Sequence, residues 1–117
     1  MKRFLPLLVL AAAAAVPAQM QIPKFNRTYS SSYTRGLYFQ APVQLVIIGL
    51  RVPDETNHGK QNVEVRKMSA KPPAYSSSTT GTTLFYKTGV PSNQMILCTP
   101  PLMVKKGDWI GVLAACG

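Results

Sequence analysis

The chain has 117 residues, of which 13 are Lys or Arg and 4 are Asp or Glu, so its formal net charge is +9. This length allows one domain, and 46% hydrophobic against 15% charged residues excludes a disordered chain. Ten prolines and eight glycines without a period exclude collagen and argue against a helical bundle. Two cysteines are too few for a disulfide-dense mini-protein or a four-cysteine zinc site.

Residues 1–18 have the layout of a secretory signal peptide. Two basic residues are followed by an uncharged apolar run from Phe4 to Val16, and small residues precede a cleavage point between Ala18 and Gln19. A membrane-spanning helix needs about 20 apolar residues, so this run is too short to act as an anchor. The sequence therefore predicts an N-terminal signal helix, no transmembrane anchor, and a secreted protein that is extracellular or periplasmic.

The rest of the chain is organised as short segments. Residues 19–34 are polar with scattered aromatic side chains, and they predict either a flexible arm or a first strand. From residue 35 onward, short apolar segments alternate with turn residues, which is typical of β-strands. Loops are expected at 53–61 and 69–81, where turn-forming residues gather. The expected strands are 35–41, 43–52, 62–68, 82–88, 94–99 with 102–104, and 109–116.

Two of these segments carry finer expectations. Segment 43–52 is rich in β-branched residues and apolar on both sides, which predicts a central strand with a bulge at Gly49. In segment 62–68, Val63 and Val65 are expected to point inward, because apolar and polar residues alternate there.

The segments together predict an all-β domain over residues 35–117. We expect an antiparallel β-sandwich of jelly-roll-like form, preceded by the N-terminal signal helix. A closed barrel is the alternative arrangement for the same number of short strands.

The last two strands predict a covalent link. If a turn centred on Gly107 joins them as a hairpin, Cys98 lies directly opposite Cys116 on an apolar face. Opposed residues in an antiparallel pair have Cα atoms about 4.5–5.5 Å apart, which a disulfide can bridge, and such bonds persist in secreted proteins. The alternative is two buried thiols, because the intervening prolines could shift the register by one residue.

The chain offers little catalytic chemistry. A Ser-His-Asp triad can be assembled on paper from Ser76, His58 and Asp54, but no nucleophile-elbow glycine pattern accompanies it. Zinc-ligand spacing and a phosphate-binding glycine loop are both lacking in the sequence. Residues 54–58 include oxygen ligands suited to Ca²⁺, although the polarity of a turn explains the same residues. The sequence therefore predicts a protein that is not an enzyme and holds no cofactor or metal.

The excess of basic residues is the main functional signal. In a secreted protein the available polyanions include anionic polysaccharides and cell-surface polymers, so we expect a partner of this kind and no specific nucleic acid. Ordinary solubility charge is the alternative, because the basic residues are dispersed along the chain. The candidate ligand surface consists of Tyr38, Arg51, Tyr75 and Trp109. Core packing is the alternative role for Trp109.

Three stretches contain motifs typical of strands and turns: RGLYFQAPVQLVIIGLRVP (Arg35–Pro53), QNVEV (Gln61–Val65) and KKGDWIGVL (Lys105–Leu113). They resemble segments of bacterial secreted β-sandwich modules of unassigned function, which are found in exported proteins with C-terminal sorting signals. The resemblance implies a sandwich fold similar to carbohydrate-binding and adhesion domains, and it assigns no chemistry. Because such modules usually continue for several more strands, it also implies either a short member or a truncated reading frame.

Two functions are compatible with these features. The first is a secreted, non-catalytic β-sandwich protein that binds a cell-surface or extracellular matrix polymer such as an acidic glycan. The alternative is a structural, self-assembling extracellular subunit that uses an open sheet edge to add strands from another chain. The sequence leaves the oligomeric state open.

Overall fold

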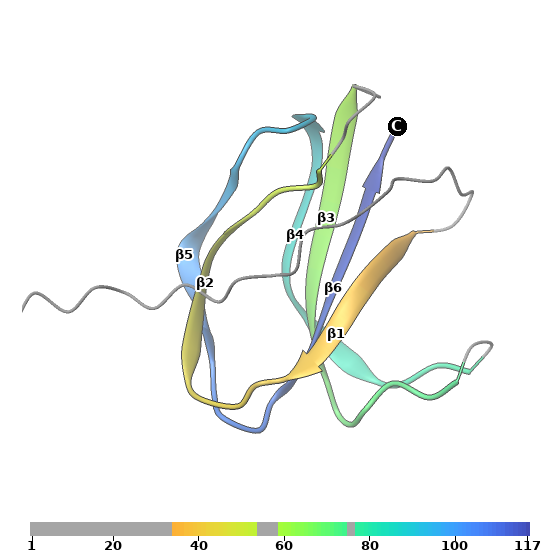
Figure 1. Ribbon diagram of the computed structural model, residues 1–117, viewed down its shortest axis with the longest axis vertical. Helices are drawn as coiled ribbons and strands as arrows, with labels where there is room; N and C mark the ends of the chain where they lie inside the picture. Colours follow the sequence, from red (N-terminus) through yellow and green to blue (C-terminus); the bar gives the residue numbers. More distant parts are fainter. Residues whose placement is uncertain (1–33, 54–58, 75–76) are drawn as a thin grey trace, which may run out of the picture.

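The structure is a computed structural model, which describes residues 34–53, 59–74 and 77–117. Its elements within these ranges are six β-strands, without a helix (Figure 1). The all-β class expected from the sequence is therefore confirmed for the described part. No helix found in that part is long and apolar enough to cross a membrane.

Several predictions from the N-terminal sequence fall outside the described residues. These are the signal helix over 1–18, the cleavage point between Ala18 and Gln19, and all but the last residue of the arm over 19–34. They stay predictions.

The six strands follow the alternation of apolar and polar residues closely. The last one covers the same residues as predicted, and the fifth runs as one strand through the proline pair that was expected to divide it. The strands are β1 (Arg35–Gln40), β2 (Leu45–Leu50), β3 (Lys60–Met68), β4 (Gly81–Pro91), β5 (Ile96–Val104) and β6 (Trp109–Cys116).

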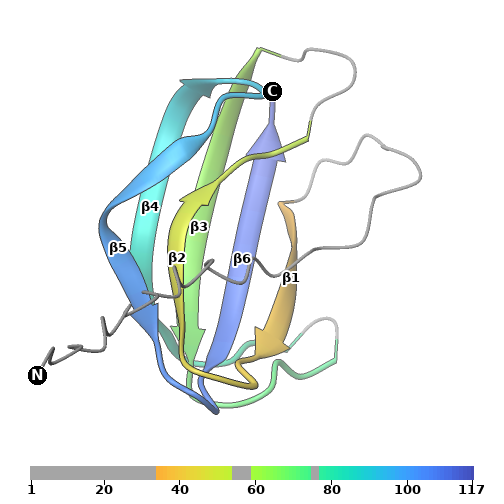
Figure 2. The same ribbon diagram turned by 60° about the vertical axis from the view of Figure 1, so that its left-hand side comes forward.

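The strands form two sheets in which every neighbouring pair is antiparallel. The first, which we call the large sheet, has the order β1-β6-β3-β4. The second, the small sheet, consists of β2 and β5. Figure 1 shows the small sheet to the left of the large one, and Figure 2, turned so that this side comes forward, shows β2 and β5 side by side in front of the large sheet.

The core is shared by the two sheets. Its buried members are Val65 and Ile110 from the large sheet, Val104 from the small sheet, and Ala41 from the connection between β1 and β2. Partly buried apolar residues from both sheets pack against them, namely Phe39, Leu45, Ile47, Leu50, Leu84, Phe85, Leu102 and Val112. Because a sheet can bury an apolar face only against another element, the shared core is what holds the two sheets together.

The predicted alternation in the third strand is confirmed. Val63 and Val65 are buried. Glu64, which lies between them, and Arg66, which follows them, are not buried. The same inward row begins with Gln61, which is fully buried although the sequence predicted a loop at this position.

The prediction of a central strand at 43–52 is wrong. β2 pairs with β5 in the small sheet, and the interior strands of the large sheet are β3 and β6. One side of β2, with Leu45 and Ile47, packs against the core, while Val46 and Ile48 on the other side are exposed. The register does shift between Ile47 and Gly49, as the expected bulge requires.

The prediction of a final β-hairpin is also wrong. Its two strands lie in different sheets, because β5 pairs with β2 while β6 pairs with β1 and β3. The turn between them crosses from the small sheet to the large one. It is held by Ala41, whose N–H donates to the Asp108 carbonyl at 2.9 Å and whose carbonyl accepts from Gly107 N–H at 2.8 Å.

The crossing turn overturns the predicted disulfide. Cys98 is buried on β5 and Cys116 ends β6, so they are not cross-strand neighbours, and neither forms a disulfide bond. The physical reason is the register between β1 and β6. Ala41 and Asp108 extend this register by one pair beyond Gln40 and Trp109, so the strand after the turn pairs with β1 instead of with β5.

Candidate functional site

The face of the large sheet that points away from the core carries Tyr38 and Trp109 together with several polar side chains. Directly opposed residues of an antiparallel pair share a face, and Ile110 on the inner face is fully buried, so its neighbours Trp109 and Gly111 point outward. We call this side the outer face. The register places on it Tyr38 of β1, Trp109, Gly111 and Leu113 of β6, Glu64, Arg66 and Met68 of β3, and Tyr86 of β4.

An aromatic pair lies at one end of the outer face. Tyr38 stands opposite Gly111, and Trp109 lies diagonally across from it, so that the ring centroids are 6.3 Å apart with planes tilted by 48°. This geometry falls within the range favoured by aromatic pairs. Tyr38 is 49% exposed, which leaves part of the residue open to a ligand.

A thioether and a glycine complete this end of the face. Met68 stands opposite Trp109, and its Sδ and Cε atoms are 3.5 Å from the place where a Cβ on Gly111 would lie. The side chain of Met68, which belongs to β3, therefore extends over Gly111 of the neighbouring strand β6. Tyr38, Trp109 and Met68, which we call the aromatic platform, offer a largely apolar surface with a phenol hydroxyl and an indole N–H at its margins.

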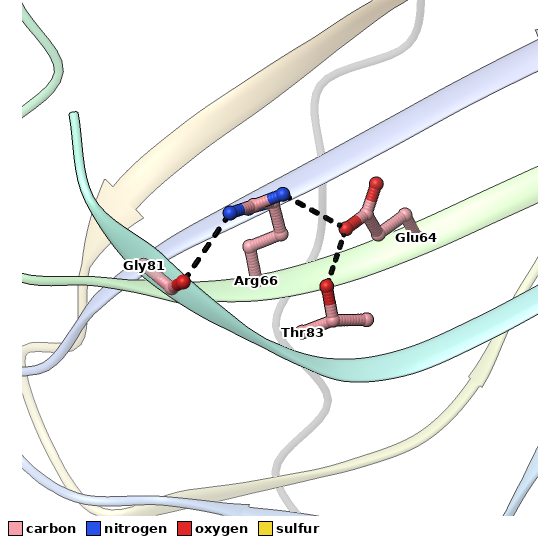
Figure 3. A network of polar contacts seen from close by, with 4 residues as sticks. All are labelled: Glu64, Arg66, Gly81 and Thr83. Atoms are coloured by element: carbon pink, nitrogen blue, oxygen red, sulfur yellow. Dashed lines mark hydrogen bonds and ion pairs between the residues drawn. The ribbon is translucent and has the colours of Figure 1, made fainter. Parts of the chain in front are cut away.

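A polar network lies on the outer face along β3 and β4 (Figure 3). Arg66 forms an ion pair with Glu64 at 3.2 Å and also donates to the Gly81 carbonyl at 3.3 Å. Thr83 donates to the same Glu64 oxygen at 2.7 Å. These bonds hold the guanidinium and the carboxylate in fixed positions, although both remain accessible, with side-chain exposures of 37% and 23%.

A shallow hollow of about 500 Å³ borders this network. Asn62 helps to shape its rim, because its side-chain oxygen accepts a hydrogen bond from Gly89 N–H at 3.1 Å. The hollow is lined by a mixture of polar, aromatic and apolar residues, namely Thr34, Asn62, Val63, Glu64, Tyr86, Thr88, Leu113 and Ala115. It is open and mixed in character, which suits a weakly held polar ligand better than a deeply enclosed one.

Positive charge dominates the described residues. They include nine Lys and Arg residues but only two carboxylate side chains, Glu64 and Asp108. Glu64 pairs with Arg66, and Asp108 pairs with Lys67 at 3.1 Å. Hydrogen bonds from the Lys105 backbone and the Lys67 side chain lower the pKa of Asp108. The surplus cations give the protein a positive field that attracts polyanions.

Two of the four predicted ligand residues come together. Tyr38 and Trp109 form the aromatic pair described above. Arg51 lies just beyond the end of β2, so it follows the small sheet and is not on the outer face of the large one. Tyr75 lies outside the described residues.

The sequence did not identify several residues of the site. Met68 and Thr83 reach the outer face only through the pairing of β3 with β6 and β4. Tyr86 could be named from the sequence as an aromatic candidate, but its place opposite Glu64 follows from the pairing of β3 with β4. Alternation within the third strand did indicate that Glu64 and Arg66 point outward, but it gave no sign of their ion pair.

The candidates for catalysis and metal binding cannot be placed. Asp54, His58 and Ser76, with the rest of loop 54–58, lie outside the described residues. Among the residues that the structure does describe, no group of three or more His, Cys, Asp and Glu side chains is arranged to hold a metal ion. Burial raises the pKa of the Cys98 thiol, which disfavours the nucleophilic thiolate.

Comparison with protein-family models, with curated proteins and with solved structures finds no match to this chain.

Proposed function

We propose that this chain is a secreted, non-catalytic β-sandwich protein that binds an acidic polysaccharide or a similar anionic cell-surface polymer through the outer face. The observation that carries this proposal is the aromatic pair of Tyr38 and Trp109 on a sheet of a strongly cationic domain. Flat aromatic surfaces suit the apolar faces of sugar rings, and cations suit their acidic groups.

The sandwich arrangement, with jelly-roll-like connections, is part of the proposal. Its support is a continuous antiparallel ribbon that bends from one sheet into the other. The β1–β6 pairing from Arg35 and Ala114 extends to Ala41 and Asp108, and the same register continues on the other side of the bend in the β2–β5 pairing. A long ribbon folded across two sheets with a shared core is typical of jelly rolls.

The surplus positive charge supports a polyanion rather than a neutral polymer. Attraction between exposed charges is screened over about 8 Å at physiological ionic strength, so the cations act on a ligand that lies against the surface. Arg66 is bonded to Glu64, which lines the hollow, and its bonds to Glu64 and Gly81 fix its direction. A fixed cation loses less conformational freedom when it binds an anionic group.

The location and the family are further parts of the proposal. A signal peptide over residues 1–18 would export the chain to the extracellular space or the periplasm. The resemblance of segments such as Arg35–Pro53 to bacterial secreted modules fits a role at the cell surface. Neither needs a cofactor or a catalytic residue.

The proposal is tested by retention on immobilised acidic polysaccharide, with heparin and alginate as the charged probes and dextran as the neutral one. We expect retention on the charged matrices at low salt, elution as salt rises, and roughly tenfold weaker binding for Tyr38→Ala and Trp109→Ala. Val43→Ala removes an exposed apolar side chain from the β1–β2 connection and should bind normally. Absence of retention on both charged matrices at low salt would reject the proposal.

A further inference from the structure

The small sheet has an uncovered apolar face. Val46 and Met103 are directly opposed on it and are 45% and 61% exposed, and Ile48 and Leu97 are 63% and 67% exposed. Met95 belongs to the same side, because its sulfur atom lies against Gly49, which is opposite Leu97. We call these five side chains the small-sheet face.

The small sheet also differs from the large one in charge. Neither β2 nor β5 contains a charged residue. Within the described part of the chain, the charged strand residues all belong to the large sheet, namely Arg35, Lys60, Glu64, Arg66, Lys67 and Lys87. The molecule therefore presents one charged sheet and one that is apolar and uncharged.

The composition of β2 indicates that both of its sides are meant to be covered. A β-branched strand that is apolar on both faces is typical of burial on both faces, yet only the side with Leu45 and Ile47 meets the core. The small-sheet face exposes on the order of 500 Å² of apolar surface, at the upper end of what single monomers expose. It approaches the roughly 800 Å² per partner of a standard protein–protein interface.

We propose that a second copy of this chain covers the small-sheet face, by stacking the two faces in a symmetric dimer. An interface of this kind brings the same patch from both subunits together, so it must be self-complementary. An apolar patch without charge meets this condition, because stacking brings no like charges into contact within it. The modest area makes the dimer weak, with a dissociation constant in the micromolar range or above.

The net positive charge does not prevent this dimer. Packed sheets lie about 10 Å apart, so in the sandwich proposed above the two large sheets would be separated by about 30 Å. This distance is several times the screening length of about 8 Å at physiological ionic strength. The remaining repulsion comes from Arg51, Lys105 and Lys106, which lie in the connections at the ends of the small sheet. Salt should therefore strengthen the dimer.

An anionic lipid surface is the competing occupant. It would draw on cations beside the apolar side chains, but β2 and β5 supply none. A sheet edge is a different mode of association, since edge pairing uses backbone N–H and C=O groups instead of the side chains of a face.

Sedimentation equilibrium tests the proposal on the chain from Gln19 onward, which contains all described strands. Over about 1 µM to 500 µM we expect a monomer–dimer equilibrium that tightens as salt is raised. Leu97→Lys, and separately Met103→Lys, should raise the dissociation constant at least about tenfold. Tyr86→Lys is the matched control, because Tyr86 is 64% exposed on the opposite sheet and should leave the dimer unchanged. Circular dichroism of each variant checks that it is folded.

Four results would overturn the proposal. They are a monomer at every concentration and salt, an association that survives both lysine substitutions in folded protein, an equal effect of Tyr86→Lys, and a monomer that binds phosphatidylserine vesicles through Leu97. Failure of the polymer-binding proposal is distinguishable, because Trp109→Ala is expected to weaken polysaccharide binding roughly tenfold while leaving the dimer intact. The sign of the salt dependence also separates the two, since salt weakens the first interaction and strengthens the second.

Discussion

The side-chain amide of Gln61 donates a hydrogen bond of 2.7 Å to the carbonyl oxygen of Gln94, which joins the large sheet to the chain that enters the small one. The same amide donates to Pro91, and its oxygen accepts from Val52 N–H at 2.8 Å. One buried side chain thus satisfies backbone groups just after β2, at the end of β4 and just before β5. Buried polar groups stabilise a fold when every partner is satisfied, as they are here.

Replacement of Gln61 by alanine should destabilise the domain by about 2–3 kcal/mol, because three backbone groups lose their partner and a cavity is left. Urea unfolding measures this change. Gln40→Ala is the matched control: Gln40 is exposed and makes one bond to the Gly107 carbonyl, so its loss should cost less than about 0.5 kcal/mol. Equal stability of the two variants would contradict the role assigned to Gln61.

Gly36 allows β1 and β6 to approach each other. A Cβ at this position would collide with the Val112 carbonyl oxygen, whereas a Cβ at Gly111 would make an ordinary contact with Met68 at 3.5 Å. We therefore expect Gly36→Ala to lower the free energy of unfolding by about 1–3 kcal/mol, and Gly111→Ala to change it much less. Thermal unfolding of both variants provides the comparison, and a harmless Gly36→Ala would show that the β1–β6 pairing differs from the one described.

Asp108 makes stability depend on acidity. Because hydrogen bonds from Lys105 and Lys67 lower its pKa in the folded state, the carboxylate stabilises the fold above its unfolded pKa of about 3.9, and this contribution is lost as pH falls through the lower folded value. The melting temperature of the parent should drop more steeply than that of Asp108→Asn between about pH 5 and pH 2. Parallel curves for the two proteins would refute the contribution.

The cysteines should remain reduced under oxidising conditions, because the crossing turn sends β5 and β6 to different sheets. Intact-mass measurement after export should show both thiol hydrogens present. Alkylation of Cys98 should be slow in the native protein, since burial raises its pKa, and fast in denaturant. A disulfide-bonded mass, or a fall in melting temperature on adding reductant, would contradict the topology described.

The sequence predicted the strands better than their partners. Alternation identifies a strand and its inward side from adjacent residues alone, which is why Val63 and Val65 were placed correctly. Pairing depends on which distant segments share a core, and neighbours in the chain are only the usual choice. The assumption that consecutive strands pair placed Cys98 opposite Cys116, and it failed because Ala41 binds the turn.

The candidate site shows the same division. Tyr38 and Trp109 were named as candidate ligand residues, with core packing as the alternative for Trp109, but their contact depends on the β1–β6 register. The network of Glu64, Arg66 and Thr83 depends on the pairing of β3 with β4, which follows a long loop. Residue types thus provided the candidates for the site, while their arrangement required the structure.

The most direct test of the polymer-binding proposal uses the fluorescence of Trp109, which is the only tryptophan in the chain. Titration with heparin at about 0.05 M salt should change its emission in a saturable way, and about 0.5 M salt should reverse the change. Tyr38→Ala should weaken the response, while dextran should produce none. Heparin binding that leaves the emission of Trp109 unchanged, with full affinity in Tyr38→Ala, would place the ligand elsewhere and contradict the proposal.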